Sequence, residues 1–237
     1  MKEKNIAIVL AAGSGRRMNS DISKQYLLIE DKPILYYTLK AFEESLVDEV
    51  VLVVPKGEIE YCKEEIIEKY NIKNVSQIVE GGKERYHSVW NGIQAVEAIE
   101  NTYIYIHDGV RPFISTVDIE KLHSEVRNCR ACVLGVISKD TIKIGDDKSY
   151  CVNTPNRKNV WCVQTPQVFD YKLIKFAYER LINSEEDLIS NGINVTDDAM
   201  VVEIFADTRV KMVEGSYKNI KITTPEDIDI AAVFLKD

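Results

Sequence analysis

The sequence has no apolar run that approaches the length of a transmembrane helix. A helix that spans a bilayer needs about 20 consecutive, mostly apolar residues, and every apolar run here is far shorter. The first residues lead almost at once into a strand-like apolar run, without the pattern of a signal peptide. We therefore expect a cytoplasmic protein that does not span a membrane.

The chain also lacks an excess of positive charge. Its formal net charge is -8 at pH 7, whereas proteins that bind nucleic acid or membrane surfaces by general attraction are normally basic. We therefore expect no nucleic-acid partner and no membrane partner. Any site for an anion must be local.

Cysteine is scarce, and its spacing indicates neither disulfides nor a metal. The chain has 5 cysteines, an odd number that does not resemble a disulfide framework. Cys129 and Cys132 form a CxxC pair, but Cys151 and Cys162 do not supply the second compact pair of a structural zinc site. We expect buried free thiols, and the sequence gives Cys129 and Cys132 no role beyond packing.

Repeats, low-complexity tracts and linkers are missing too, so we expect one domain over residues 1–237. Apolar β-branched runs alternate with amphipathic segments up to residue 137, which is typical of β–α units and a mostly parallel sheet. The predicted strands are 6–10, 50–54, 75–79, 103–106 and 132–137, and the predicted helices are 34–44, 59–70, 86–99 and 117–128.

The pattern changes beyond residue 138. Residues 140–144 and 149–153 flank a polar turn, which predicts a β-hairpin. A two-stranded excursion is marginally stable alone, so we expect an arm at about 138–160 that packs on the body or on another subunit. Further along we predict helices at 171–183, after 196–198 and from 225, and strands at 209–213 and 219–222. The predicted fold is α/β, a mostly parallel twisted sheet flanked by helices, with a protruding β-hairpin arm.

A glycine-containing loop with cations follows the first predicted strand. Residues 10–18 read LAAGSGRRM, and Lys24 comes six residues later. Gly13 and Gly15 allow the backbone to approach a ligand closely, while Arg17 and Lys24 supply full charges, a combination that suits a polyphosphate. Short glycine motifs also match by chance, so an ordinary turn stays the alternative.

Two more polar clusters follow predicted strands. Residues 80–89 read EGGKERYHSV, where paired glycines at a helix N-terminus expose N–H groups to an anion; the alternative is a plain turn with Ser88 in solvent. Residues 106–112 read IHDGVRP. There Asp108 could hold Mg²⁺ or accept hydroxyl hydrogen bonds and Arg111 could bind a phosphate, unless the two only form an internal ion pair.

The C-terminal half adds three candidates. Arg157 and the run 160–169 combine a cation with hydroxyl and amide groups that suit a polyol phosphate, although 164–167 could be only a turn. Residues 196–198 have a simpler explanation as a helix N-cap. Lys221 projects from an apolar predicted strand, where a lysine needs an anionic partner, and this makes it a candidate ligand contact.

Taken together, these motifs resemble the 2-C-methyl-D-erythritol 4-phosphate cytidylyltransferase family, which uses CTP in non-mevalonate isoprenoid biosynthesis. The matching pieces run in order over nearly the whole chain: AAGSGRRM, KQ, GGKERYHSV, HDGVRP, DTIK, the arginine of NRKNVW, VQTPQ, TDDA and NIKITTPED. The resemblance implies a Rossmann-like nucleotidyltransferase sheet and a homodimer joined by the β-arm. It also implies CTP and a sugar-alcohol phosphate as partners, with Mg²⁺ or another divalent cation as cofactor.

The resemblance implies roles for individual residues as well. The catalytic cations would be Arg17, Lys24 and Lys221. The nucleotide would contact Ala11, Ala12, Gly13, Gly15, Gly82 and Ser88. The sugar phosphate would contact Asp108, Arg111, Thr165 and Thr196, and also Thr141 and Arg157 on the arm of a second subunit. The metal is expected mainly on the CTP phosphates, with Asp108 as its one candidate protein ligand.

The sequence departs from the family's pattern at two places. Gly109-Val110 stands where many members have two alanines, and Lys83 stands where an acidic residue can occur. The first departure keeps open a related family, the ribitol 5-phosphate cytidylyltransferases that form CDP-ribitol. The arginine pair at 16–17 and the run 161–167 favour the methylerythritol family.

The chemistry of the clusters favours an enzyme over a non-catalytic nucleotide-sensing module. A sensor would keep a glycine loop but would not need Arg17, Lys24, Asp108 and Lys221 together. The clusters supply cations and N–H groups, without a Ser-His-Asp set or paired carboxylates. Phosphate attack needs no general base, because the second pKa of a phosphate monoester is about 6.

Overall fold

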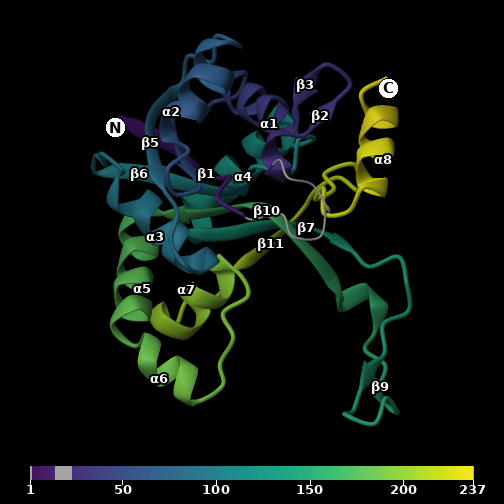
Figure 1. Ribbon diagram of the computed structural model, residues 1–237. Coiled ribbons are helices and arrows are strands. Elements are labelled where there is room, and N and C mark those ends of the chain that lie inside the picture. The colour runs from purple at the N-terminus through teal and green to yellow at the C-terminus, as the bar shows by residue number, and fades with distance from the viewer. Residues whose placement is uncertain (1, 14–22, 237) are drawn as a thin grey trace.

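The computed structural model describes residues 2–13 and 23–236. Its centre is a seven-stranded sheet in the order β11-β7-β10-β6-β1-β4-β5 (Figure 1). The strands are β1 (Glu3–Leu10), β4 (Glu49–Val54), β5 (Val75–Glu80), β6 (Asn101–Asp108), β7 (Ala131–Ile137), β10 (Trp161–Asp170) and β11 (Lys211–Glu214). Only β10 runs antiparallel to its neighbours in this sheet. The predicted mostly parallel sheet is therefore confirmed.

Helices cover both faces of the sheet because successive strand residues point to opposite sides. In β1, Ala7 and Val9 join one buried cluster, whereas Ile6 and Ile8 join another. The first cluster includes residues of α1 (Ile34–Glu43), α2 (Ile59–Cys62), its π-helical continuation η3 (Lys63–Glu68) and α4 (Thr116–Cys129). The second includes residues of α3 (Arg85–Gln94), α5 (Tyr171–Asn183), α6 (Glu185–Ser190) and α7 (Asp198–Ala206).

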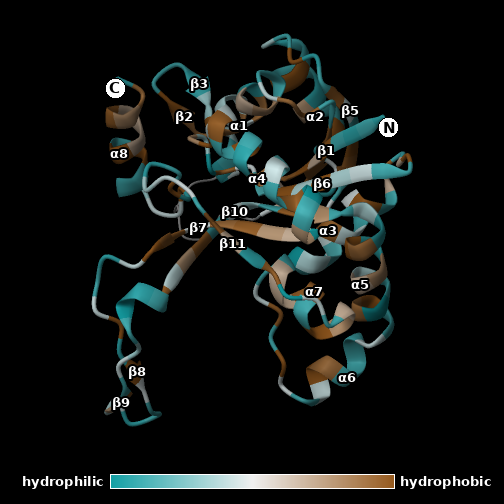
Figure 2. Cartoon of the chain, turned by 180° about the vertical axis from the view of Figure 1, so that it is seen from behind, coloured by the Kyte–Doolittle hydropathy of each residue, from teal (hydrophilic) through white to brown (hydrophobic). Residues whose placement is uncertain are grey.

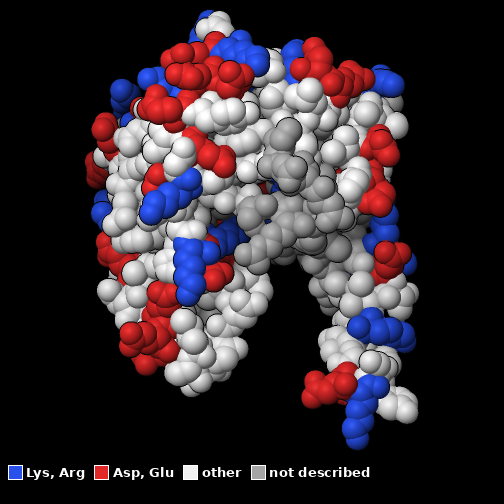
Figure 3. Space-filling view, viewed as in Figure 1, with Lys and Arg blue, Asp and Glu red and all other residues white. Residues whose placement is uncertain are grey.

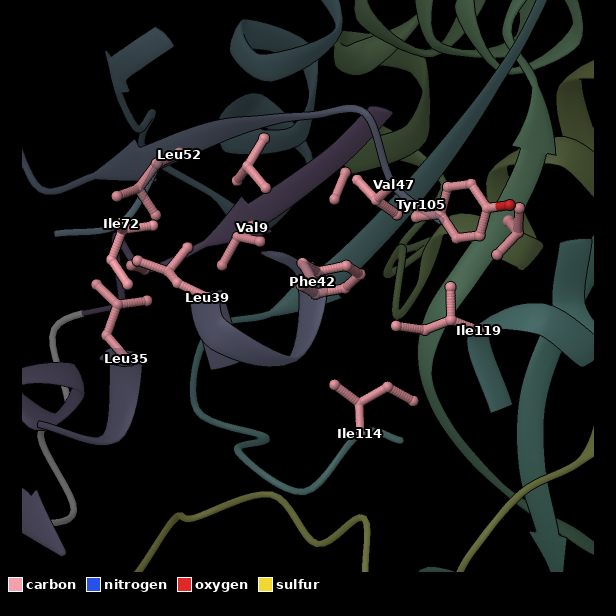
Figure 4. Packing of buried hydrophobic residues seen from close by; sticks show 14 of the residues in the cluster. Val9, Leu35, Leu39, Phe42, Val47, Leu52, Ile72, Tyr105, Ile114 and Ile119 are labelled. Atoms are coloured by element: carbon pink, nitrogen blue, oxygen red, sulfur yellow. The ribbon is translucent and has the colours of Figure 1, made fainter. Parts of the chain in front are cut away.

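Figure 4 shows the first of these clusters from close by. Val9 and Leu52 of the sheet lie over Leu39 of α1, and Phe42 fills the space between them and Tyr105. All five side chains are fully buried. Burial of side chains of this size stabilises the fold by roughly 1.5 to 3 kcal/mol each, so the sheet is a firm base for groups at its edge.

A third, smaller cluster attaches the C-terminal helix α8 (Glu226–Phe234) to the body. Ala231 of α8 packs with Ile29, Ile34, Val110 and Ile222. Ile29 belongs to a two-stranded hairpin, β2 (Leu28–Ile29) with β3 (Lys32–Pro33), that follows the short helical turn η2 (Lys24–Tyr26). None of the helices in the described part of the chain is long and apolar enough to cross a membrane, and the cytoplasmic location stays a prediction.

The predicted hairpin is present and forms an arm that extends from the body (Figures 1 and 2). Its strands β8 (Ile144–Gly145) and β9 (Cys151–Asn153) pair antiparallel, and a turn η4 (Arg157–Asn159) leads back to β10. The strands are shorter than the predicted ones, because only the central residues next to the turn pair. Several apolar side chains of the arm are exposed, among them Ile144, Tyr150 and Val152.

Other predictions need correction. The predicted strand 219–222 is not part of any sheet: the N–H of Ile222 donates to the Val110 carbonyl (2.9 Å), and the carbonyl of Asn219 accepts from an arginine side chain. The alternative that 164–167 is only a turn is wrong, because these residues lie within β10, where the pairing register shifts between Val163 and Gln167. Helix α3 ends at Gln94 rather than at residue 99, and α6 was not predicted.

Candidate functional site

A cavity of about 510 Å³ lies where the carboxyl ends of β1, β5 and β6 meet, the usual ligand position in open α/β sheets. Its described lining consists of Leu10, Ala11, Ala12, Gly13, Lys24, Gln25, Gly82, Lys83, Glu84, Arg85, Ser88, Asp108, Val110 and Lys221. Figure 3 shows acidic and basic side chains interspersed over one face of the molecule. Because this face has no large area of one charge, we expect the charged side chains that line the cavity to determine which ligand binds there.

The segments after β1 and β5 touch at one wall of the cavity. The N–H of Ala11 donates to the Val53 carbonyl (2.7 Å), and the N–H of Gly81 donates to the Val54 carbonyl (2.8 Å), so both segments continue the register of β4. A Cβ at Gly81 would lie 2.4 Å from the Cβ of Ala12. This contact is why position 81 has no room for a side chain.

The wall continues into the N-terminus of α3. The N–H of Gly82 donates to Oγ of Ser88 (3.0 Å), which bends the chain back over the first turn of the helix. A Cβ at Gly82 would meet the Cβ of His87 at 2.3 Å. The N–H of Glu84 donates to Nδ1 of His87 (3.2 Å) as part of a capping box. Paired glycines thus let the backbone close tightly over the start of a helix, where anions bind well.

Asp108 carries the negative charge of the site and lies among three cations. Its Oδ2 is 2.8 Å from Nζ of Lys221 and 3.8 Å from Nε of Arg111, and its Oδ1 is 3.7 Å from Nε of Arg85. Burial alone would raise the pKa of Asp108, but Arg85, Lys221 and Arg111 outweigh burial and hold that pKa well below its usual range. The carboxylate is therefore ionised at neutral pH.

Hydrogen bonds fix the end of β6 behind this carboxylate. The N–H of Asp108 donates to Oγ1 of Thr165 (3.1 Å), whose hydroxyl lies 3.1 Å from Nδ1 of His107. His107 is fully buried, stacks edge-on against Phe42 and has its Nε2 3.2 Å from the Arg111 carbonyl. Since Thr165 accepts from Asp108, its own hydrogen is available to Nδ1, which leaves a neutral His107 that donates through Nε2. Burial lowers the pKa of His107 to about 4.

The segment that carries Lys221 is held by side chains of β10. Gln164 donates to the Ser216 carbonyl (2.9 Å), and the fully buried Asn219 donates to the Thr165 carbonyl (2.9 Å). A guanidinium nitrogen of Arg111 donates to the Asn219 carbonyl (2.9 Å). The backbone before Lys221 therefore rests on side-chain hydrogen bonds, which place its ammonium over Asp108.

The structure brings most of the predicted site residues together. Ala11, Ala12, Gly13, Lys24, Gly82, Ser88, Asp108 and Lys221 line the cavity, and Arg111 and Thr165 contact Asp108 from behind. Asp108 is the last residue of β6 rather than part of a loop. Gly15 and Arg17 lie outside the described residues.

Three predicted substrate contacts lie away from this cavity. Thr196 is exposed, and its hydroxyl is 3.6 Å from the sulfur of Met200. Thr141 and Arg157 are exposed on the arm, where Arg157 donates to the Lys139 carbonyl (3.1 Å). None of the three belongs to the described lining of the cavity.

Four polar residues of the described lining had no assigned role, namely Gln25, Lys83, Glu84 and Arg85. Arg85 was part of the motif GGKERYHSV but had no assigned role, and Gln25 was part of the pair KQ. Gln25 is only 1% exposed, and its Nε2 has no hydrogen-bond partner among the described residues. Proximity to the predicted loop cations and glycines was the available signal in each case.

The described side chains do not include a cluster that would hold a metal ion by protein ligands alone. Among residues 2–13 and 23–236, no group of three or more His, Cys, Asp or Glu side chains is placed to hold a metal ion. Asp108 is the predicted protein ligand, but Lys221 already occupies the carboxylate and two arginines compensate its charge.

The five cysteines are free thiols, as expected, but only Cys62 and Cys132 are buried. Cys129 is half-buried, and Cys151 and Cys162 are exposed, so the expectation of burial is wrong for them.

Comparisons with known proteins agree with one another. A family model described as 2-C-methyl-D-erythritol 4-phosphate cytidylyltransferase (IspD) matches residues 5–237. A protein of that name from Lachnoclostridium phytofermentans is 48% identical over 235 residues, 99% of this chain and 97% of the relative. One from Lachnospira eligens is 51% identical over 233 residues, 98% of this chain and 99% of the relative. The crystal structure of 4-diphosphocytidyl-2C-methyl-D-erythritol synthase from Anaerococcus prevotii superposes with a TM-score of 0.84 at 38% identity, covering 99% and 97% of the two chains.

Proposed function

Because this chain belongs to the 2-C-methyl-D-erythritol 4-phosphate cytidylyltransferase family, we propose that its cavity binds CTP beside that sugar phosphate and joins the two. The chain is a nucleotidyltransferase of isoprenoid biosynthesis, and its products are 4-diphosphocytidyl-2-C-methyl-D-erythritol and pyrophosphate. One observation carries the placement of both substrates: Gly13, Gly82 and Ser88 line the same cavity as Asp108 and Lys221.

We place the nucleotide against the wall formed by residues 11–13, Gly81, Gly82 and Ser88. Backbone groups that follow β1 and precede α3 face this part of the cavity, and the N-terminus of a helix favours an anion. The N–H of Gly82 is engaged by Ser88, so Gly82 contributes close backbone approach rather than a donor. Lys24 lines the same cavity and supplies charge for the triphosphate.

We place the sugar phosphate beside Asp108. An ionised carboxylate accepts hydrogen bonds from hydroxyl groups, which a methylerythritol chain offers. Lys221 lies over the carboxylate with its side chain 38% exposed, so its ammonium can pass from Asp108 to a phosphate oxygen. Arg111 and Thr165 lie directly behind Asp108 and keep it in place.

The reaction then needs positioning and charge rather than a base. A phosphate oxygen of the sugar phosphate attacks the α-phosphorus of CTP, the new P–O bond forms, and the bond to the β-phosphate breaks. Pyrophosphate leaves with the electron pair. The attacking oxygen is already anionic because the second pKa of a phosphate monoester is about 6. Lys24, Lys221 and Arg17 are the residues we propose to stabilise the charge that develops at phosphorus.

We propose that the divalent cation enters with CTP as part of the substrate. Triphosphate oxygens are good ligands for Mg²⁺, whereas Asp108 is compensated by three cations and would have to exchange Lys221 for a metal. The metal supplies charge compensation on the triphosphate when it is bound. Direct ligation by Asp108 is therefore not part of the proposal.

We propose further that two chains form a homodimer through the arm. Tyr150 and Val152 are 72% and 62% exposed, and contiguous exposed apolar groups are typical of interfaces. A hairpin of this size is also marginally stable without a surface to pack on. Thr141 and Arg157 sit on this arm and would reach the cavity of the second chain.

The activity is tested by pyrophosphate release from CTP with 2-C-methyl-D-erythritol 4-phosphate and, separately, with ribitol 5-phosphate. We expect turnover with the methylerythritol substrate and at most a small fraction of it with ribitol phosphate. Preferential turnover of ribitol phosphate would assign the cavity to CDP-ribitol formation. Nucleotide binding without release of pyrophosphate from either pair would indicate a sensor.

A further inference from the structure

Arg85 occupies an unusual position for a cation. It is the first residue of α3, where the positive end of the helix dipole disfavours positive charge. Its guanidinium is nonetheless flanked by two carboxylates, Asp198 of α7 and Asp108 of β6. Both carboxylates raise the pKa of Arg85 against the effect of its burial, so it stays charged.

The bond to Asp198 fixes the guanidinium in one orientation. NH1 donates to Oδ1 (2.9 Å) and NH2 to Oδ2 (2.8 Å), the bidentate geometry of a strong arginine–carboxylate pair. Asp198 is fully buried and also accepts from the hydroxyl of Tyr178 (2.5 Å). This anchor does not line the cavity.

The anchor itself is held by the start of α7. Asp197 caps the helix by accepting from the N–H of Met200 (3.0 Å), and Gln167 of β10 donates to Asp197 (2.9 Å). The side-chain carbonyl of Gln167 also accepts from the N–H of Ala199 (2.8 Å). Hydrogen bonds from Gln167 thus fix the start of α7 to the sheet, and Arg85 connects Asp198 in this helix with Asp108.

The remaining side of the guanidinium faces the cavity. Nε of Arg85 lies 3.7 Å from Oδ1 of Asp108, which is close enough for charge attraction but too long for a hydrogen bond. Arg85 therefore compensates the carboxylate without using a lone pair of Oδ1. Lys221 contacts the other oxygen, Oδ2.

We propose that Arg85 is a positioning residue that acts through Asp108. Anchored on Asp198, it keeps the Asp108 carboxylate in one orientation with Oδ1 presented to a hydroxyl of the sugar phosphate. This inference rests on the proposed function, because it assumes that Asp108 binds that substrate. It predicts that loss of the anchor weakens binding of the sugar phosphate and leaves binding of CTP unchanged.

The first test is Arg85→Lys, which keeps the charge but loses the fork that holds Asp198. We expect the KM for the sugar phosphate to rise about tenfold, the loss expected when one charge-assisted contact is weakened. The KM for CTP should change less than about twofold on the same basis. Arg127→Lys is the matched control, because Arg127 pairs with Glu3 on the surface of α4.

The second test is Asp198→Asn, which leaves Arg85 in the cavity and replaces its charged bidentate anchor, which also accepts from Tyr178, with a neutral amide. A positioning role predicts that this variant reproduces the rise in sugar-phosphate KM. If Arg85 instead contacts the ligand directly, Asp198→Asn should bind both substrates as the unmodified protein does, and the inference fails. An equal rise of both KM values in Arg85→Lys would also overturn it.

Two further variants guard against misfolding and test the route through Asp108. Arg85→Gln alone would leave the buried Asp198 carboxylate without a cationic partner. Arg85→Gln is therefore combined with Asp198→Asn, which gives a neutral pair. This double variant should show the same rise in the KM for the sugar phosphate. In an Asp108→Asn background, Arg85→Lys should add less than about a twofold effect, since coupled residues are not additive. A full additional tenfold loss there would contradict action through Asp108.

Failure of the inference can be told apart from failure of the proposed function. Turnover by the unmodified chain with CTP and 2-C-methyl-D-erythritol 4-phosphate tests the function. If that turnover is present and Arg85→Lys matches the unmodified protein, only the role of Arg85 is wrong. If the unmodified chain does not turn over, the function is wrong and the role of Arg85, which depends on it, falls as well.

Discussion

The ammonium of Lys221 lies 2.8 Å from Oδ2 of Asp108 at the base of the cavity. Lys221 comes from the segment after β11 and Asp108 from the end of β6, so the fold joins distant parts of the chain at one point. Arg85 and Arg111 add two more cations within 4.0 Å of the same carboxylate. The Asp108 carboxylate therefore holds three cationic side chains close to the place where we propose that the two anionic substrates bind.

We expect Lys221→Ala to reduce kcat by about 10²- to 10³-fold, the usual effect of removing one preorganised contact to developing charge. The fold should survive, because Arg85 and Arg111 still compensate Asp108. Steady-state pyrophosphate release and thermal melting measure the two effects. Lys211→Ala is the matched control, since Lys211 pairs with Glu125 on the surface. Near-normal turnover in Lys221→Ala would remove this lysine from the mechanism.

The fold could be predicted where hydrophobic periodicity is undisturbed. Residues 6–9 and 50–54 are buried on both faces, and such strands read as continuous apolar runs. The strand expected at 219–222 fails because its apolar residues serve another purpose: Ile222 packs under α8, while Asn219 hydrogen bonds to β10. Hydrophobic periodicity predicts which residues are buried, but it does not predict the hydrogen-bond partner of a backbone N–H or carbonyl group.

The site could be predicted where a ligand loop follows directly after a strand. Gly13 and Gly82 qualify, and Asp108 ends its strand at the same edge, since the carboxyl ends of parallel strands converge. Arg85 could not be assigned, because a charge in a helix-starting motif is usually solvated, and its partner Asp198 comes from a remote helix that only the fold brings near. The roles of residues on the arm depend on a second chain and so stay predictions.

Replacing Gly81 with alanine should push the segment after β5 away from the segment after β1 at the proposed nucleotide site. A Cβ there would lie 2.4 Å from the Cβ of Ala12 and 2.9 Å from Oγ of Ser88, so Gly81→Ala must push the two segments apart. We expect a stability loss of about 1 to 3 kcal/mol, typical of overpacking, and a KM for CTP that rises more than the KM for the sugar phosphate. Gly145→Ala is the control, because its Cβ would make only an ordinary 3.6 Å contact. Unchanged CTP affinity in Gly81→Ala would contradict the placement of the nucleotide.

Acid should destabilise the fold through His107. Burial lowers the pKa of this histidine to about 4, from an ordinary value of 6.5. Between these two values the unfolded chain binds a proton that the folded chain excludes, so stability rises with pH across this window and falls as the solution is acidified. From pH 6.5 to 4.5 the loss from this group should be about 2 to 3 kcal/mol, at about 1.4 kcal/mol per pH unit.

His107→Gln isolates that contribution. Glutamine can donate to the Arg111 carbonyl as Nε2 of His107 does, but it does not titrate. Urea unfolding at pH 6.5 and pH 4.5 should therefore show a smaller acid-induced loss in His107→Gln than in the unmodified protein. Equal losses in the two proteins would mean that other groups dominate the acid response.

The arm predicts a complementation experiment between two impaired variants. Arg157→Ala should weaken binding of the sugar phosphate with little effect on CTP, because Arg157 lies on the arm rather than in the cavity of its own chain. In a mixed dimer of Arg157→Ala with Lys221→Ala, one cavity keeps Lys221 and receives an intact arm from the other chain, while the second cavity lacks both residues. The purified mixed dimer should therefore keep about half of the sites of the unmodified dimer, and an unpurified, randomly paired mixture about a quarter. Co-expression with two different tags and purification of the mixed species measures this recovery, and a mixed dimer no more active than its parents would show that each arm does not serve the opposite cavity.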